Sequence, residues 1–260
     1  MSVKILKKTI TNDYFSFNAM TFLADEESKN TSSNIFAVFS HGYTASKSDL
    51  INWATRLSSA GINVCIFDLP GHHLGSYNEV RSFDDFTEHA QDCFLDAFNL
   101  LREQAGVSCE RLILGGHSLG ALLAIKALDT PELAAYSPIG VGVGLGISQH
   151  ATTHLFESSF YQKTLNIRRQ LVHENIDSMD MFTWIKEEKL QLSLTGHRIH
   201  LITGKDDIVV EAGGMHELAD LLESRGNNVS RSEPNRLPHN NPELAGSHIF
   251  SFVKKELNLL

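Results

Sequence analysis

The chain has 260 residues, 42% of them hydrophobic and 20% charged, which is the composition of a globular protein with a sizeable core. Its formal net charge is −9 and no basic run occurs, which argues against nucleic-acid binding. The N-terminus lacks the apolar core of a signal peptide, and the longest apolar stretches, such as 138–147, are far shorter than the roughly 20 residues that span a bilayer.

In the first half of the chain, strand-like and helix-like segments alternate, which predicts βαβ units around a largely parallel sheet. Two amphipathic strands at about 3–10 and 14–23 are expected at a sheet edge, and the apolar run at 35–39 is typical of a central parallel strand. A helix is predicted over 48–60, with Ser48 as its N-cap and Gly61 as its stop. The elements predicted next are a strand at 64–67, an amphipathic helix over 84–104, a strand at 111–114 and a buried helix over 121–128.

The second half continues this alternation after one interruption. Strands are predicted at 139–147, 199–202 and 227–233, and helices over 211–225 and 242–257. The interval 148–197 is polar and charged, with aromatic and apolar residues at helical spacing, which predicts a helical insertion between two strands rather than a long loop. We therefore expect an α/β core of residues 1–147 and 198–260, with a mostly parallel sheet of about eight strands flanked by helices, and an insertion over 148–197.

The motif that carries chemistry follows the predicted strand at 111–114. Gly116, Ser118 and Gly120 form the Gly-x-Ser-x-Gly pattern of a nucleophile elbow, and a buried helix comes directly after it. The residues two before and two after the serine approach each other closely in such a turn, so both need to be small. The turn lifts the serine hydroxyl above the sheet and directs a helix N-terminus at the reacting group. We predict that Ser118 is a catalytic nucleophile.

A serine hydroxyl needs a base and an orienting acid, and these follow an elbow serine in the order acid, histidine. The acid is expected just after the strand at 199–202, where Asp206 and Asp207 stand side by side; we favour Asp207. His239 lies in a loop after the last predicted strand and before the final helix, so we predict that it is the base. The alternative is His248, which lies inside that helix.

Two backbone N–H groups are expected to form an oxyanion hole. One belongs to Leu119, the residue after the nucleophile, and the other to Tyr43, in the loop after the strand at 35–39. Gly42 lets this loop approach a substrate closely. His41 precedes Ser118 in the chain, which is the wrong order for the base, so we assign it to shaping the loop.

Five motifs in order resemble the α/β-hydrolase superfamily, and most closely its esterase, monoglyceride-lipase and serine-aminopeptidase-like branch. They are Phe39-Ser40-His41-Gly42-Tyr43, Phe67-Asp68-Leu69-Pro70-Gly71-His72, Gly116-His117-Ser118-Leu119-Gly120, Gly204-x-x-Asp207 and His239. The resemblance covers about 34–147 and 198–258, and it implies the α/β-hydrolase fold, a Ser–Asp–His triad and a cap formed by 148–197. The loop at 71–76 carries an apparent extra residue, and Pro238 stands where this family often has glycine before its catalytic histidine.

The expected activity is that of a serine hydrolase acting on a carboxylic ester or related acyl substrate through an acyl-enzyme. An acyl thioesterase is the alternative enzyme, and a non-catalytic ligand-binding protein on the same fold is the alternative of another class. The insertion supplies large side chains that either line an acyl pocket or pack the insertion onto the core. These are Phe156, Phe160, Met179, Met181, Phe182 and Trp184.

No cofactor and no metal are expected. His150 and His154 stand four residues apart, but a third metal ligand is missing, so we interpret them as polar residues of the insertion. Three cysteines without a CxxC spacing are typical of a reducing compartment, so a cytoplasmic location is expected. The expected partner is a small-molecule acyl substrate; the sequence does not define the oligomeric state.

Overall fold

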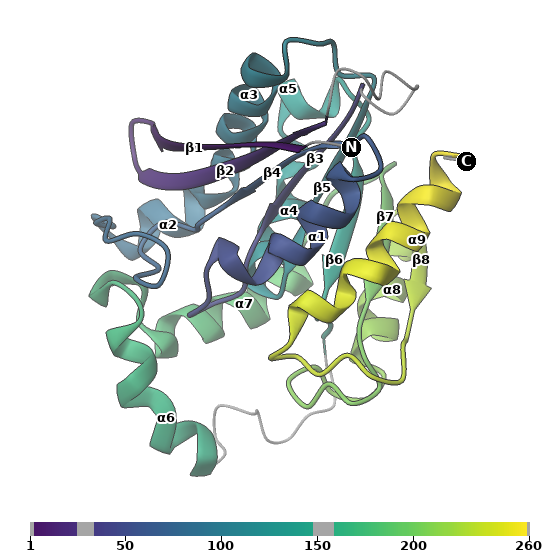
Figure 1. Cartoon of the computed structure of the whole chain (residues 1–260). Helices are drawn as coiled ribbons and strands as arrows, with labels where there is room; N and C mark the ends of the chain where they lie inside the picture. Colours follow the sequence, from purple (N-terminus) through teal and green to yellow (C-terminus); the bar gives the residue numbers. More distant parts are fainter. Residues whose placement is uncertain (1–2, 25–33, 148–158, 259–260) are drawn as a thin grey trace.

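The structure, a computed structural model, describes residues 3–24, 34–147 and 159–258. Eight strands form one sheet in the order β1-β2-β4-β3-β5-β6-β7-β8 (Figure 1). β1 pairs with β2, and β2 with β4, in antiparallel fashion, whereas the other neighbours are parallel. The strands are β1 (Val3–Thr11), β2 (Ser16–Ala24), β3 (Ile35–Ser40), β4 (Asn63–Phe67), β5 (Arg111–His117), β6 (Ile139–Val143), β7 (Arg198–Ile202) and β8 (Asn228–Ser232). The predicted α/β class and its mostly parallel sheet are confirmed.

Helices cover both faces of the sheet, because the side chains of each strand point alternately to one face and the other. Phe36 and Val38 of β3 belong to the core cluster that includes residues of α3, α4 and α8, whereas Ala37 and Phe39 belong to the cluster that includes residues of α1 and α9. The helices are α1 (Ile51–Ser58), α2 (Phe83–His89), α3 (Cys93–Ala105), α4 (Leu119–Ala127), α5 (Pro131–Ala134), α6 (Ser159–Gln170), α7 (Ser178–Gln191), α8 (Gly214–Ser224) and α9 (Gly246–Glu256). Within the described ranges, no helix combines the length and the apolar character that crossing a bilayer requires.

Several element ends differ from the sequence prediction for local reasons. The N-cap before α1 is Ser46 rather than Ser48, because the hydroxyl of Ser46 accepts the Ser48 N–H at the start of the 3-10 turn Lys47–Leu50. β6 ends at Val143 instead of continuing to residue 147, because Gly144 adopts a φ of 63° that no strand accommodates. A 3-10 turn, Ala90–Asp92, divides the predicted helix over 84–104 into α2 and α3.

The interval 148–197 contains α6, a 3-10 turn (Glu174–Ile176) and α7 in its described part, all between β6 and β7. In Figure 1, α6 and α7 lie below the sheet, at the end from which β5 leads into α4. Two backbone hydrogen bonds join the segment after α6 to the 71–76 loop: His73 N–H donates to Leu171 at 2.9 Å, and His173 N–H donates to Gly71 at 2.8 Å. The 71–76 loop, which carries the apparent extra residue, therefore holds this segment of the insertion against the core through backbone hydrogen bonds.

Candidate active site

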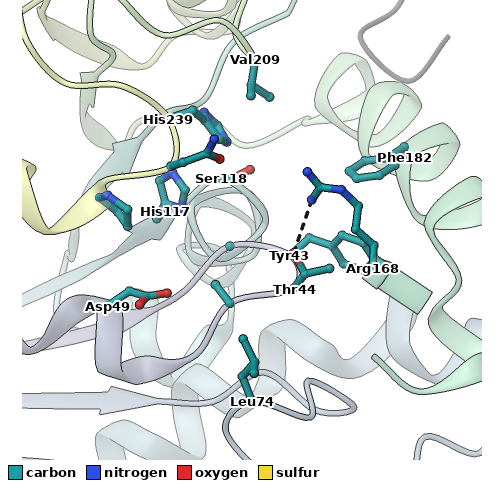
Figure 2. A pocket seen from close by; sticks show the side chains of 14 residues that line it. Tyr43, Thr44, Asp49, Leu74, His117, Ser118, Arg168, Phe182, Val209 and His239 are labelled. Atoms are coloured by element: carbon teal, nitrogen blue, oxygen red, sulfur yellow. Dashed lines mark hydrogen bonds between the residues drawn. The ribbon is translucent and has the colours of Figure 1, made fainter. Parts of the chain in front are cut away.

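Ser118 occupies a strained turn between β5 and α4. Its φ of 50° and ψ of −112° are values that residues other than glycine rarely adopt, and they cost on the order of 1–3 kcal/mol. Its N–H donates to the carbonyl oxygen of Val143 at 2.8 Å, so the neighbouring strand β6 holds the turn in place. The Ser118 hydroxyl projects into a pocket (Figure 2).

The two glycines around Ser118 are small because the turn leaves no room for a side chain. A Cβ atom on Gly116 would lie 2.5 Å from the carbonyl carbon of Gly120, and one on Gly120 would lie 2.4 Å from the carbonyl oxygen of Ser40. Backbone atoms cannot move aside as a flexible side chain can. The close approach predicted from the motif spacing therefore explains why Gly116 is small, whereas Gly120 must be small because the backbone at the end of β3 lies against it.

The structure brings Asp207 and His239 together and gives the neighbouring Asp206 a different task. Asp207 Oδ2 accepts from His239 Nδ1 at 2.8 Å, while its Oδ1 accepts the N–H groups of Val209 and Val210 at 2.8 and 2.9 Å. A carboxylate only accepts, so Nδ1 of His239 carries the proton and Nε2 is the basic nitrogen.

Asp206 Oδ1 accepts the N–H of Leu237 at 2.7 Å, two residues before His239. The two adjacent carboxylates therefore divide their roles, since one contacts the imidazole and the other fastens the loop that carries it.

The loop of His239 is also fixed by a side chain of α1. The 3-10 turn Pro242–Ala245 begins three residues after His239, and the buried indole N–H of Trp53 donates to the Pro242 carbonyl oxygen at 2.7 Å. The side chain of His239 is 9% exposed, and that of Asp207 is 1% exposed. His248, the alternative base, lies on α9 and is not among the residues lining the pocket of Ser118.

The loop after β3, which carries Tyr43, lies against the nucleophile elbow and lines the same pocket as Ser118. The carbonyl oxygen of Gly42 lies 2.8 Å from His41 Nδ1 and accepts the Ala45 N–H at 3.2 Å. The two polar groups of one peptide plane point in opposite directions, so these contacts direct the Tyr43 N–H away from His41. A Cβ atom on Gly42 would lie 3.3 Å from Ser118 Cβ, which places the loop against the elbow.

Leu119, the other expected oxyanion donor, is the first residue of α4. Its N–H is one of the four N-terminal groups that have no acceptor within an α-helix. The side chain of Leu119 is fully buried in the core, so only its backbone is positioned to act at the elbow.

Beneath this loop lies a buried polar cluster of His41, Asp68, Lys47 and His72. The Leu69 N–H donates to His41 Nε2 at 2.9 Å, and Asp68 accepts both the backbone N–H of Lys47 at 2.8 Å and its ammonium group at 2.5 Å. Burial lowers the pKa of His41 to about 4 and that of His72 to about 3. Both imidazoles are therefore neutral at pH 7, and the side chain of His41 contacts the loop backbone at Gly42 and Leu69.

His117 is a pocket residue that sequence reasoning passed over. It is 6% exposed, and its ring centroid lies 4.6 Å from that of His239. Neither ring nitrogen has a hydrogen-bond partner in the described structure. Burial, followed by the nearby imidazoles of His239 and His41, holds its pKa well below the usual range, so it is neutral at pH 7. The signal available in the sequence was its place inside the elbow motif.

The cavity beside Ser118 has a volume of about 240 Å³. Its lining includes Leu74 from the 71–76 loop, Val209 from the turn after Asp207, and two residues of the insertion, Arg168 and Phe182 (Figure 2). Phe182 was one of the six large insertion residues singled out from the sequence. Of the others whose surroundings are described, Met181 is buried in the core, Trp184 packs against the core, and Met179 is half exposed.

Among residues 3–24, 34–147 and 159–258, no three His, Cys, Asp or Glu side chains gather as a metal site would require. His150 and His154 lie outside the described residues. The groups at the site are a hydroxyl, an imidazole bound to a carboxylate, and backbone N–H donors, which together suit nucleophilic acyl transfer.

Comparisons with known proteins identify the family and the fold of the chain. The profile of the Alpha/beta hydrolase family matches residues 37–220. No curated protein matches the chain.

Solved structures with the same fold are numerous and distant in sequence. A thermostable carboxyl esterase from Bacillus coagulans superposes with a TM-score of 0.66 at 13% identity, covering 99% of each chain. An esterase from Pyrococcus furiosus gives 0.60 at 18%, covering 98% of this chain and 92% of that one. An epoxide hydrolase from Vigna radiata gives 0.60 at 12%, covering 98% and 99%. Since these proteins act on different bonds, the likeness establishes the α/β-hydrolase fold alone.

Proposed function

Because the chain belongs to the alpha/beta hydrolase family, we propose that it is a serine hydrolase that cleaves a carboxylic ester or related acyl substrate. The observation that carries the proposal is the meeting of Ser118 and His239 in one pocket, with Nδ1 of His239 held by Asp207 at 2.8 Å. This arrangement leaves Nε2 as the nitrogen that takes the serine proton.

In the first half of the reaction, Ser118 Oγ attacks the substrate carbonyl carbon while His239 Nε2 accepts its proton. The negative charge that develops on the carbonyl oxygen is stabilised by the N–H groups of Tyr43 and Leu119. His239 then protonates the leaving alcohol, and the carbon–oxygen bond of the ester breaks. Asp207 stabilises the imidazolium during this step without itself becoming protonated.

In the second half, a water molecule attacks the acyl-enzyme, and His239 takes one of its protons. The tetrahedral intermediate collapses, the acid product leaves, and the proton returns to Ser118. Each group in this cycle belongs to the protein, the substrate or water, so the proposed reaction needs no cofactor.

The named activities of the similar structures agree with this proposal. Two of the three compared proteins are described as esterases, in Bacillus coagulans and Pyrococcus furiosus. The third is described as an epoxide hydrolase. An ester substrate fits the serine nucleophile of this chain.

We also propose that 148–197 acts as a cap, since Arg168 and Phe182 of this interval line the same pocket as Ser118.

Reaction with a fluorophosphonate probe, followed by peptide mass spectrometry, tests the proposal directly. We expect labelling at Ser118 in the wild type and none in Ser118→Ala. Ser247→Ala, which removes an exposed hydroxyl on α9, is the matched control and should be labelled like the wild type. A folded wild-type protein that neither reacts with the probe nor hydrolyses short-chain nitrophenyl esters would contradict the proposal and favour a ligand-binding protein.

We also propose a cytoplasmic location. Cys65, Cys93 and Cys109 are all free thiols, and the first two are buried in the core. Unpaired cysteines of this kind are typical of proteins in a reducing compartment. Alkylation of all three thiols in denatured protein taken directly from cells would support this location, and a mixed disulfide at any of them would contradict it.

A further inference from the structure

The pocket beside Ser118 is lined by two charged residues of opposite sign, Arg168 and Asp49. Arg168 comes from the last turn of α6 in the insertion, and Asp49 comes from the 3-10 turn Lys47–Leu50 of the core. In the view of Figure 2, the two side chains lie on opposite sides of Ser118. The site that would hold a substrate therefore has a cationic end and an acidic end.

Arg168 is directed into the pocket by its neighbours. Its Nε donates to Thr164 Oγ1 at 3.4 Å, one helical turn earlier, and its Nη1 donates to Thr44 Oγ1 at 3.5 Å across the gap to the core. Figure 2 shows the guanidinium group between Phe182 and the Ser118 hydroxyl. These two contacts orient the guanidinium group toward the cavity.

Arg169, the next residue of α6, contacts the insertion instead of the pocket. Arg169 is not among the residues that line the pocket, and it forms an ion pair with Asp177, at 2.6 Å between Nε and Oδ2. Two adjacent arginines thus serve two purposes, one tying α6 to the start of α7 and the other facing the reaction site. The chain as a whole carries a formal charge of −9, so a cation at this place changes the local potential that a substrate meets.

We propose that the substrate carries an anionic group, a carboxylate or a phosphate ester, which Arg168 binds while Ser118 attacks the ester carbonyl. This inference rests on the proposed hydrolase function and names the substrate class for it. A guanidinium group binds such oxyanions through paired N–H donors. These donors set the orientation of the bound anion in addition to attracting its charge. Asp49 would repel the same group, so the two charges together determine which way round the substrate lies.

The size of the cavity limits the substrate further. Its volume of about 240 Å³ is below the roughly 300–1,000 Å³ of pockets that hold drug-sized ligands. Apolar side chains also line it, among them Phe182, Leu74 and Val209, but they enclose a space of limited length. A short ester with one charged end therefore fits the pocket better than a long neutral acyl chain.

The test compares matched esters that differ in charge. 4-Nitrophenyl hydrogen adipate and its neutral methyl ester place the charge on the acyl side, whereas 4-acetoxybenzoate and its methyl ester place it on the alcohol side. For each pair, the measured quantity is kcat/KM for the anionic ester divided by kcat/KM for its neutral partner. For at least one pair, we expect this ratio to be about 10- to 100-fold lower in Arg168→Gln than in the wild type, which is the range for a charge-assisted hydrogen bond. Arg168→Lys keeps the charge and should retain a larger part of the ratio than Arg168→Gln.

Lys163→Gln is the matched control, because it removes one positive charge from an exposed position of the same helix. The control should keep the wild-type ratio for both ester pairs. Ratios that are equal in the wild type and in Arg168→Gln would overturn the inference while leaving the proposed hydrolase intact. Failure of the wild type to hydrolyse any of the four esters would count against the hydrolase itself.

A binding measurement tests the anion site without relying on turnover. Calorimetric titration with adipate should show binding to the wild type that weakens at least about 10-fold in Arg168→Gln but not in Lys163→Gln. Adipamide has the same length and no charge. Its affinity for the wild type and for the Arg168 variants should be weaker than the affinity of the wild type for adipate. Equal affinity for adipate and adipamide would overturn the inference whether or not the protein hydrolyses esters.

Discussion

The hydroxyl of Tyr43 donates to the carbonyl oxygen of Ile176 at 2.8 Å, which joins the loop beside Ser118 to the insertion. Ser178 Oγ lies 3.2 Å from the same hydroxyl, and the ring of Tyr43 packs edge-on against Phe182 with 5.1 Å between centroids. One residue thus supplies an expected oxyanion N–H from its backbone and a contact with the insertion from its side chain. The position of the insertion and that of the N–H group are therefore coupled.

Replacing Tyr43 with Phe tests this coupling. The ring remains, but the hydrogen bond to Ile176 is lost, so we expect kcat to fall by about 2- to 10-fold, as for one neutral hydrogen bond. Ester hydrolysis measured over a range of substrate concentrations separates kcat from KM. Tyr77→Phe, at a residue that is 87% exposed, is the control and should leave both constants unchanged. A Tyr43→Phe enzyme with wild-type kcat would show that the two elements are not coupled.

The two adjacent aspartates should respond very differently to the same substitution. Asp207→Asn removes the acceptor that fixes the proton on Nδ1 of His239, and in triads of this kind such a change lowers kcat by about 10⁴-fold. Asp206→Asn keeps an oxygen that can accept the Leu237 N–H, so we expect a loss below about 10-fold. Single-turnover rates with a nitrophenyl ester would measure both. Equal losses in the two variants would contradict the assigned roles.

Trp53→Phe should destabilise the protein by about 1–3 kcal/mol, because it leaves the buried carbonyl oxygen of Pro242 without its donor. Urea denaturation at pH 7 would show the change as a lower midpoint with an unchanged m-value. Since Pro242 follows the loop of His239, a lower kcat is expected at temperatures where the variant is still folded. An unchanged midpoint would mean that this hydrogen bond contributes nothing to stability.

Stability should fall as the pH is lowered from about 6.5 to 4. An unfolded histidine binds its proton near pH 6.5, whereas burial lowers the folded pKa of His41 to about 4 and that of His72 to about 3. Between these values the unfolded chain binds more protons, so acid favours unfolding, by about 1.4 kcal/mol per pH unit for each histidine.

His72→Asn tests the contribution of one histidine, since the amide can still donate to the Pro70 carbonyl oxygen that lies 3.0 Å from His72 Nδ1. Denaturant midpoints measured at pH 4.5, 5.5, 6.5, 7.5 and 8.5 should show a shallower acid slope in the variant than in the wild type. The slopes above pH 7 should coincide. An identical acid slope in both proteins would contradict the assignment.

The sequence predicted each strand of the described sheet, because buried strands are marked by apolar runs and edge strands by alternation. It also predicted the tight turn at Ser118, since the Gly-x-Ser-x-Gly spacing has a steric cause that the structure reproduces at Gly116, while the need for a small residue at Gly120 comes from the end of β3. The choice between Asp206 and Asp207 was harder. The two residues share one turn and one chemistry, and only the direction of each carboxylate separates their tasks.

Sequence reasoning could not have found Arg168. It stands beside Arg169 in the same helix, and nothing in the local pattern indicates which of the two faces the core. The direction depends on how α6 docks against the loop of Thr44, which is a contact between residues more than a hundred positions apart. The same limit applies to Tyr43, whose partner Ile176 lies equally far along the chain.

The two hydrogen bonds that join the segment after α6 to the 71–76 loop determine how far the cationic end of the pocket can move. Leu171, which accepts one of these bonds, lies only three residues beyond Arg168. A residue so close to a fixed point is displaced less by a tilt of the helix than the residues at the far end of the helix. The distance between the guanidinium group and the nucleophile therefore depends mainly on where this segment is joined to the core.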